Sequence, residues 1–506
     1  MYYKVRSFVI KGSTVVDLDI EVTISSRGIP RVEVTGVKGG ECVKSIRKIR
    51  TAFSNSGLEF PNKKMNVNVY PAGLISDLAD IEFPISMSIL LVHSGSVSGT
   101  SDLFYGGVDS AGYLVPSVKT IFMDDGWASG RIGRLFIPDK SYYFNEKKND
   151  LNVYKLSSLG DAAKFFIKGN GMTLIESQSL SHSYVPEIRG GAGCFCNVLG
   201  NARAKRALTI SISGHHNILM LGPSGTGKSL LAEKSARMFP AGTTKDVVEI
   251  LKAGVLCGLP VENVVTTPFR RPHISVSEGS LIGSPRMPGE ATLGHKGILF
   301  LDEMHLFRPK VLNSLKTVID LKKIEFHNEG VPVSYPADFL LIGAANNCMC
   351  GLLGAEDRQC KCNGKDINTY NMRMNASLLE RFDILTYVSG SSLEASRLKN
   401  GEECHATCPV REQIGKAVSI QRNRLAHLGI SYNSGIPYNS INRICNLEGD
   451  ASSLLEMTVS RYGLSTRAVH RILAVSRTIA DLENASEISA AHLAEAVQYR
   501  VKNDKP

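Results

Sequence analysis

The sequence lacks an apolar run long enough to cross a membrane. Its longest nearly apolar stretch, residues 81–92, contains Glu82 and has only 12 residues, whereas a membrane-spanning helix needs about 20. The first ten residues include Lys4 and Arg6 but no continuous apolar segment, so a secretory signal is not expected there. We therefore expect a cytoplasmic protein that has no membrane partner.

The sequence also lacks internal repeats, low-complexity tracts and an even number of cysteines. In a chain without a secretion signal, its 11 cysteines are expected to be thiols or metal ligands rather than a disulfide framework. The composition is otherwise ordinary, with 43% hydrophobic and 21% charged residues over 506 positions. This length predicts two to four domains. The 58 Lys and Arg residues against 48 Asp and Glu leave a net charge of +10, which favours an anionic partner.

Residues 1–168 are predicted to form one α+β domain. Apolar and polar residues alternate over residues 16–24 and again over 65–69, which is the period of a half-buried strand. Between these strands, residues 43–53 place apolar side chains at helical spacing and basic side chains on the opposite face. That basic face is a candidate anion surface, although a solvated helix face is the more ordinary interpretation.

Three further segments follow the first domain. Residues 169–197 are rich in Gly, Ser and Pro, which indicates a linker. Residues 198–391 alternate strand-like and helix-like segments, the pattern of a mostly parallel sheet with helices on both faces. Residues 392–506 keep apolar residues at helical spacing, so a C-terminal all-α domain is expected.

The second domain contains a candidate phosphate-binding loop. Residues 222–229 read GPSGTGKS between an apolar strand and a helical segment, the context that this motif requires. Its glycines let backbone N–H groups surround phosphates, and the following helix adds a favourable dipole. Lys228 is expected to reach the β and γ phosphates of ATP, and Ser229 to bind Mg²⁺. The predicted nucleotide-binding residues are Gly222, Pro223, Ser224, Gly225, Thr226, Gly227, Lys228 and Ser229, together with Asp302.

Two acidic residues follow a second apolar strand, residues 297–301. Asp302 and Glu303 begin 302 − 228 = 74 residues after the lysine of the loop. A strand beside the phosphate loop would deliver Asp302 to the Mg²⁺ ion and Glu303 to the attacking water as general base. The alternative is an acidic pair that caps a helix. Because the pair accompanies a phosphate loop, ATP hydrolysis is the expected chemistry.

Three more polar residues are candidate catalytic groups. Asn346 follows a third apolar strand, residues 339–343, and is expected to orient the water, unless it is an ordinary turn asparagine. Arg381 and Arg467 are candidates for the cation that phosphoryl transfer needs at the γ-phosphate, a group that a neighbouring subunit often supplies. Taken singly, each arginine would more often be a surface residue.

Four cysteines form a possible metal site just after the third strand. Cys348, Cys350, Cys360 and Cys362 have the spacing Cys-x-Cys, nine residues, Cys-x-Cys. Four thiolates suit tetrahedral Zn²⁺, and free cytosolic thiols are the alternative. The pattern of Cys404 and Cys408 is weaker, and the linker cysteines at 194 and 196 could be inert.

These motifs resemble the magnesium-chelatase-like AAA+ ATPases, and specifically the ComM/YifB family, over nearly the whole chain. Besides the phosphate loop and the acidic strand, the resemblance rests on residues 70–74 (YPAGL), 82–85 (EFPI), 201–208 (NARAKRAL), 269–273 (FRRPH), 289–297 (GEATLGHKG), 464–471 and 491–500. This resemblance implies an AAA+ P-loop core (198–391) with a C-terminal all-α lid (392–506). It also implies an α+β N-terminal domain (1–168) similar to the Lon protease domain, of the ribosomal S5 domain 2-like type.

The resemblance also implies roles for single residues. Asn346 is similar to sensor 1, Arg381 to an arginine finger that acts in trans, and Arg467 to sensor 2. A homo-hexameric ring is implied, with residues 269–288 and the hairpin near 322–331 facing its pore. No Lon-type catalytic serine motif is present, and only Ser86 and Lys119 remain as candidates for a protease dyad, so active proteolysis is not expected.

The leading hypothesis from the sequence is an ATP-driven ring motor on branched or single-stranded DNA. The ComM resemblance implies helicase or branch-migration activity in recombination or natural transformation. Two alternatives stay open, a protein-remodelling motor and a motor subunit of the magnesium-chelatase type. A nucleotide-switched scaffold is disfavoured because Glu303 is present.

Overall fold

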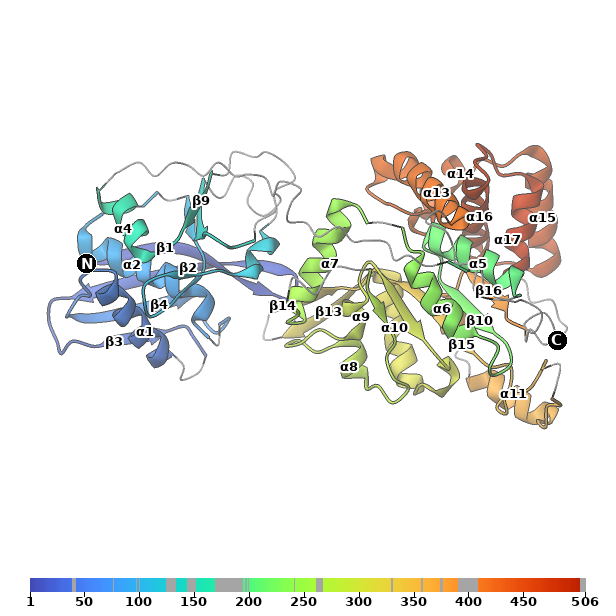
Figure 1. Cartoon of the computed structure of the whole chain (residues 1–506), viewed down its shortest axis with the longest axis horizontal. Coiled ribbons are helices and arrows are strands. Elements are labelled where there is room, and N and C mark those ends of the chain that lie inside the picture. Colours follow the sequence, from blue (N-terminus) through green and yellow to red (C-terminus); the bar gives the residue numbers. More distant parts are fainter. Residues whose placement is uncertain are drawn as a thin grey trace. The chain divides into compact units, whose positions relative to one another are not determined.

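The computed structural model of the chain divides into two compact units (Figure 1). Unit 1 comprises Met1–Pro186, Gly254–Asn263 and Glu329–Ser334, and unit 2 comprises Glu187–Ala253, Val264–Asn328 and Tyr335–Pro506. The structure describes residues 1–38, 42–75, 77–96, 98–99, 101–123, 133–142, 152–168, 194–195, 198, 200–240, 242–260, 267–328, 331–355, 358–373, 376–389 and 408–500. Apart from residues 194 and 195, the predicted linker 169–197 therefore lies outside the described residues.

Unit 1 is built on a seven-stranded mixed sheet of order β3-β4-β2-β1-β5-β8-β9. Strand β1 (Tyr2–Lys11) pairs antiparallel with β2 (Thr14–Ser25), which pairs antiparallel with β4 (Lys64–Tyr70). Leu18, Ile20 and Val22 are buried as the alternation predicts, because successive side chains of a strand face opposite sides. The two predicted strands and the predicted helix, α1 (Cys42–Asn55), are confirmed.

The apolar run of residues 81–92 lies in a helix of unit 1, α2 (Glu82–Ser94), which is buried almost throughout. In the part of the chain that the structure describes, we find no helix long and apolar enough to span a membrane. The other elements of this unit are β3 (Val32–Thr35), η1 (Ala79–Ile81), β5 (Asp102–Phe104), β6 (Gly107–Val108), β7 (Leu114–Val115), η2 (Val118–Phe122), β8 (Arg134–Pro138), β9 (Asn152–Leu156) and α4 (Leu159–Lys168).

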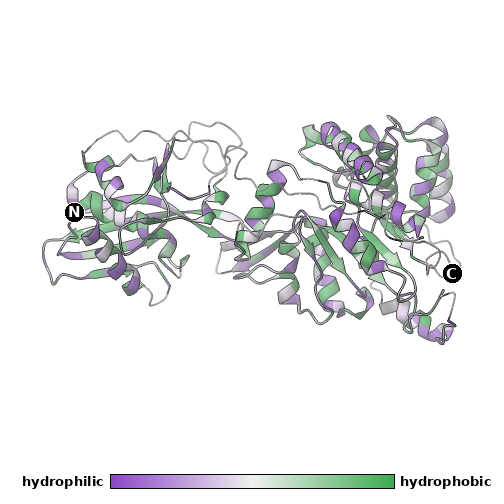
Figure 2. Cartoon of the chain, viewed as in Figure 1, coloured by the Kyte–Doolittle hydropathy of each residue, from purple (hydrophilic) through white to green (hydrophobic). Residues whose placement is uncertain are grey.

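Unit 2 is built on a five-stranded sheet of order β11-β12-β15-β10-β16, in which every neighbouring pair is parallel. The strands are β11 (Phe269–Arg270), β12 (Ile298–Leu301), β15 (Leu340–Ala345), β10 (Ile218–Leu221) and β16 (Ile384–Tyr387). Their residues are mainly apolar and buried, as expected for a sheet covered on both faces (Figure 2). The prediction of a parallel α/β sheet in this region is confirmed.

Helices and a hairpin make up the remaining elements between residues 202 and 379, which lie in unit 2 except for residues 254–256 and 331–334 of unit 1. They are α5 (Ala202–Gly214), α6 (Lys228–Arg237), α7 (Thr244–Leu256), α8 (Glu278–Ile282), α9 (Glu290–Leu293), η4 (Met304–Leu306), α10 (Pro309–Leu321), β13 (Lys323–Asn328), β14 (Val331–Pro336), α11 (Gly364–Arg373) and α12 (Ala376–Leu379). Strands β13 and β14 form the hairpin.

The C-terminal part of unit 2 is helical (Figure 1, orange to red). Its elements are α13 (Pro409–Leu425), η5 (Ala426–Leu428), η6 (Asn433–Gly435), η7 (Tyr438–Ser440), α14 (Ile441–Ile444), α15 (Gly449–Tyr462), α16 (Thr466–Leu482) and α17 (Ala490–Gln498). Helix α16 buries the apolar stripe that the sequence predicts, including Ile472, Val475 and Ile479. This stripe joins the same hydrophobic cluster as Ile218 of β10, so the lid and the sheet share one core.

Candidate nucleotide site

The phosphate loop connects strand β10, which lies between β15 and β16 in the sheet, to helix α6. Helix α6 begins at Lys228, and Gly227 before it has a φ of +87°. This left-handed conformation is costly for a residue with a Cβ, which explains the glycine. The loop therefore presents backbone N–H groups and the positive end of a helix, an arrangement suited to anions.

The Lys228 ammonium is held inside the loop by oxygen atoms. It donates to the carbonyls of Gly222 at 2.9 Å and Pro223 at 2.7 Å, and to Asn346 Oδ1 at 3.2 Å. Burial lowers the pKa of Lys228 to about 8, against the opposing effect of the carboxylates of Asp302 and Glu303. A buried cation with its own loop as its main partner is poised to accept a stronger anionic partner such as phosphate.

Asp302 and Ser229 meet because their strands are close in the same sheet. Both follow carboxyl ends of parallel strands, β12 and β10, and Ser229 Oγ donates to Asp302 Oδ2 at 2.8 Å. A hydroxyl beside a carboxylate is the donor set that hard cations such as Mg²⁺ prefer. Glu303 next to them has a φ of +49°, a strained conformation of the kind that clusters at functional sites.

Asn346 enters the site from β15, the strand between β10 and β12. Besides accepting from Lys228, it is fixed through its backbone, because its carbonyl accepts from the Tyr370 hydroxyl at 2.8 Å. The phosphate loop, Asp302, Glu303 and Asn346 line one pocket of about 750 Å³, a size suited to a nucleotide. The structure thus brings residues 224–229, 302, 303 and 346 together around one pocket. Gly222 and Pro223 do not line this pocket, and their carbonyls accept from the Lys228 ammonium.

The wall of the pocket also contains residues from the segment 269–288, which the family resemblance assigned to a ring pore. These residues are Arg271, Pro272, His273 and Ile274. The Arg271 guanidinium lies 2.5 Å from Asp302 Oδ2 and 3.3 Å from Glu233 Oε1. The parallel pairing of β11 with β12 brings this segment to the site, and the signal that could have revealed it is an arginine directly after a short strand.

Arg381 and Arg467 lie together but do not line the nucleotide pocket of their own chain. Both pair with one carboxylate, that of Asp320 at the end of α10, with distances of 2.7 Å for Arg381 and 2.8 Å for Arg467. Arg467 is 37% exposed and lines a second pocket of about 340 Å³ together with Asp320. No motif indicated Asp320 as the shared partner of these two arginines.

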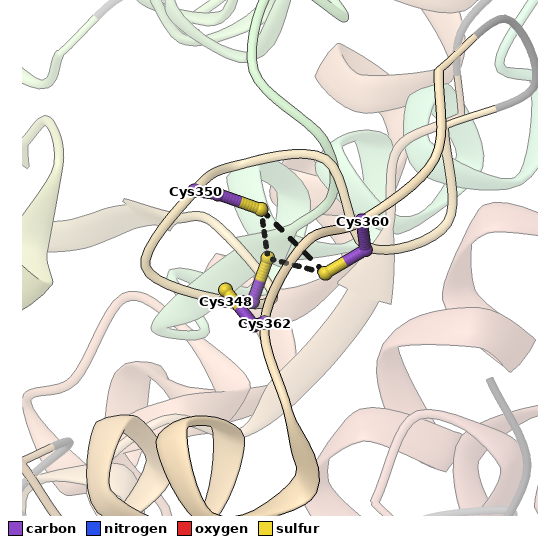
Figure 3. Close-up of side chains that lie close together, drawn as sticks. All are labelled: Cys348, Cys350, Cys360 and Cys362. Carbon is purple, nitrogen blue, oxygen red and sulfur yellow. Dashed lines mark hydrogen bonds between the residues drawn. The ribbon is translucent and has the colours of Figure 1, made fainter.

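The four predicted cysteine ligands converge, as Figure 3 shows. Their Sγ atoms lie within 4.8 Å of one another, with Cys348–Cys350 at 3.4 Å, Cys348–Cys360 at 3.6 Å and Cys350–Cys360 at 3.5 Å. These separations exceed the S–S bond length of about 2.05 Å. They are close to the roughly 3.8 Å that separates thiolates around tetrahedral Zn²⁺ with Zn–S bonds of about 2.3 Å. The residues present therefore fit zinc.

The weaker cysteine group lies partly outside the described residues. Cys194 Sγ is 3.1 Å from Cys408 Sγ, so the end of the predicted linker meets the start of the lid helix α13. Residues 196 and 404 lie outside the described part of the chain.

The two candidates for a protease dyad have other partners. The Ser86 hydroxyl is buried and donates to the Glu82 carbonyl at 2.7 Å, whereas the Lys119 ammonium pairs with Asp80. The structure thus shows no hydrogen bond between Ser86 and Lys119.

The sheet order, the phosphate loop after β10 and the helical lid define an AAA+ ATPase core. Three family models match the chain: "Magnesium chelatase, subunit ChlI" over residues 194–396, its C-terminal part over 405–500, and "Subunit ChlI of Mg-chelatase" over 20–139.

Full-length relatives identify the family more closely. The chain is 30% identical to the competence protein ComM of Haemophilus influenzae, over 95% of this chain and 94% of that protein. It is 28% identical to the uncharacterized protein YifB of Escherichia coli, over 96% and 94%. The magnesium-chelatase 38 kDa subunit of Cereibacter sphaeroides matches at 23% identity over only 30% of this chain and 52% of its own length. The chain belongs to the ComM/YifB family of magnesium-chelatase-like AAA+ proteins, a family that implies the use of ATP and Mg²⁺.

Proposed function

We propose that this protein hydrolyses ATP to drive a ring-shaped motor. The observation that carries the proposal is the convergence of Lys228, Ser229, Asp302, Glu303 and Asn346 on one pocket. Mg²⁺, when bound, would supply positive charge that neutralises the phosphates. Ser229 and Asp302 would hold that ion, and Lys228 would bind the phosphates. Glu303 would take the proton of the attacking water, which the Asn346 amide would orient.

A second copy of the chain would complete this site. Arg381 and Arg467 are absent from the pocket lining of their own chain, yet Asp320 holds them side by side. Two guanidiniums at one place suit a γ-phosphate, and arginines supplied in trans are a common device in ATPases. We therefore propose that both arginines act on the nucleotide of a neighbouring subunit in a homo-hexameric ring.

The proposed substrate of the motor is DNA, branched or single-stranded, and the proposed activity is branch migration or helicase action in recombination or natural transformation. Support comes from the relative that is named a competence protein and from the net charge of +10, because phosphate neutralisation dominates nucleic-acid affinity. Lys322 and Lys323 near the hairpin do not strengthen this proposal, since they pair with Asp338 and Glu325. A protein-remodelling motor is the second candidate.

ATP turnover measured with different DNA structures tests the proposal. The arms are no DNA, single strands, duplex, forks and four-way junctions, each with the wild type, Lys228→Ala and Glu303→Gln. Turnover that is highest on branched DNA and absent from both variants supports the DNA motor. A Lys228-dependent rate that no DNA changes favours a protein substrate instead, and a rate that persists in Lys228→Ala contradicts the ATP site.

Zn²⁺ at the four-cysteine cluster is part of the proposed function. Cys348 is buried, whereas Cys350 is exposed and the other two are half-buried, so the site is open to metal from solvent. Metal analysis of purified protein should give one zinc per chain, less in Cys348→Ser, with Cys257→Ser as the control. A content well below one in the wild type would refute zinc binding.

The proposed domain boundaries are 1–168, 198–391 and 392–506, joined by the linker 169–197, and the proposed location is the cytoplasm. Limited proteolysis followed by mass spectrometry would test the boundaries. Cleavage concentrated within residues 169–197 is the expected result, and early cleavage inside α5 or β10 would contradict it.

A further inference from the structure

We infer that the four-cysteine loop, when closed by its metal, is a working part of the ATP site and sets the affinity for nucleotide. This inference rests on the ATP and zinc sites proposed above and adds a coupling between them. The loop leaves the sheet directly after Asn346, and the last cysteine, Cys362, lies two residues before helix α11 (Gly364–Arg373). Both ends of the loop therefore lead to groups that contact the nucleotide pocket.

The first contact joins the loop to the phosphate loop itself. The Ser224 backbone N–H donates to the Gly351 carbonyl at 2.8 Å. Gly351 lies between the two pairs of cysteines and has a φ of +72°. A Cβ added there would lie 3.2 Å from Ser224 Cβ and 3.4 Å from Asn346 Nδ2, closer than an undisturbed site allows. The cysteine loop thus touches both the phosphate-binding backbone and the asparagine predicted as sensor 1.

The second contact passes through helix α11. Its Tyr370 hydroxyl donates to the Asn346 carbonyl at 2.8 Å, and its ring lies 5.1 Å from the ring of His305, two residues after Glu303. Burial raises the pKa of Tyr370 well above its usual value, so this hydroxyl stays a donor. Cys360 and Cys362 lie four and two residues before this helix, so a metal bound by them would fix its start.

The contacts of the four sulfurs in the described chain lie within the loop itself, to one another and to backbone groups of the loop. Cys348 is fully buried and its sulfur accepts from the Leu353 N–H at 3.3 Å, while Asn347 Nδ2 donates to the Leu353 carbonyl at 3.0 Å. The sulfurs of Cys350, Cys360 and Cys362 instead belong to exposed or half-buried residues, outside the hydrophobic clusters of the described chain. A metal that joins all four thiolates would supply the missing constraint, because metal binding in such loops contributes directly to folding.

Loss of the metal should therefore weaken nucleotide binding although no residue of the pocket has been substituted. The Gly351 carbonyl would no longer fix the Ser224 amide, and Tyr370 would no longer fix Asn346. A hydrogen bond of this kind contributes a factor of about 3–10 in affinity.

The experiment measures zinc content and the affinity for a fluorescent ATP analogue in the same full-length preparations. Cys360→Ser should lose zinc and bind the analogue about 3–10-fold more weakly. Gly351→Ala keeps all four thiols, so it should retain zinc and still bind more weakly. Gly364→Ala is the matched control, because a Cβ there meets no atom within 4 Å, and it should bind as the wild type does.

The outcomes separate this inference from the proposals beneath it. A wild type that binds no analogue, or binds it independently of Lys228, refutes the ATP proposal, and a wild type without zinc refutes the metal and the coupling together. Zinc loss in Cys360→Ser with unchanged affinity overturns the coupling alone. If Cys360→Ser does not fold, the Gly351→Ala variant provides the test. If Gly351→Ala keeps its zinc and binds the analogue with unchanged affinity, the coupling is overturned as well.

Discussion

Removal of the Arg271 side chain should lower the Mg²⁺ concentration that the protein needs for nucleotide turnover. Arg271 Nη2 lies 2.5 Å from Asp302 Oδ2, the same oxygen that accepts from the Ser229 hydroxyl. The guanidinium also lies 5.7 Å from the Phe300 ring centroid, which keeps its cation near this carboxylate. In the structure an arginine is therefore the cationic partner of Asp302, the carboxylate that we propose for Mg²⁺, and an ion that binds there must displace this arginine.

The size of the effect follows from exposure. The Arg271 side chain is 46% exposed and that of Asp302 is 17% exposed, so solvent and salt screen the pair strongly. Exposed pairs of this kind contribute about 0.2–1 kcal/mol. That range corresponds to a factor of about 1.4–5 in the equilibrium constant for Mg²⁺. Added salt should shrink the factor because it weakens the pair first.

The assay is a Mg²⁺ titration of ATP turnover at saturating ATP, at low and high salt, for the wild type and Arg271→Gln. Arg237→Gln, which changes an exposed arginine at the end of α6, is the control for the loss of one positive charge. The half-saturating Mg²⁺ concentration should fall only in Arg271→Gln. An unchanged value would refute the competition, and a higher value would mean that Arg271 binds the loaded nucleotide instead.

Three more predictions concern the lid and its contacts. Asp320→Ala should lower kcat several-fold with little change in KM, because Arg381 and Arg467, which we propose to act in trans, lose the carboxylate that orients them; a change confined to KM would contradict this. Asp481→Ala should lower the free energy of unfolding by about 3–5 kcal/mol in urea titrations, because it strands the buried Arg477 and its neighbour Arg424, whereas the exposed Asp450→Ala should not. Burial lowers the pKa of His215 to about 3 and of His216 to about 4, so the unfolded chain takes up protons first. Their contribution to the free energy of unfolding is then fully present above pH 6.5, and it falls by up to about 1.4 kcal/mol per pH unit per histidine as the pH drops towards 4. A free energy of unfolding that does not change between pH 7.5 and 5 would exclude this.

The core of the nucleotide site could be predicted because its residues are local to single strands. Lys228, Asp302 and Asn346 each follow an apolar segment, and parallel strands bring their carboxyl ends to one edge of the sheet. The same reasoning predicted β2, α1 and α16, because their periods are set by burial on one face. Where the local pattern agrees with the tertiary structure, the sequence alone is enough to predict the element.

Other contacts depend on tertiary structure that no local pattern encodes. Arg271 follows the two-residue strand β11, which is too short to show an alternating period. Its place in the pocket depends on the pairing of β11 with β12. The family resemblance assigned residues 269–288 to a ring pore, which stays a prediction, and motif likeness alone did not indicate the contact of Arg271 with Asp302. The contact between Gly351 and Ser224 is equally hidden, because a backbone carbonyl leaves no signature in the sequence.

Asp320 shows why the arrangement of the arginines favours a site shared between copies of the chain. Arg381 and Arg467 are separated by 467 − 381 = 86 residues, and one comes from the loop before β16 while the other comes from the first turn of α16. A single carboxylate gathers both, and neither arginine lines the nucleotide pocket of its own chain. The γ-phosphate bound by a second copy is the anionic partner that we propose for this pair.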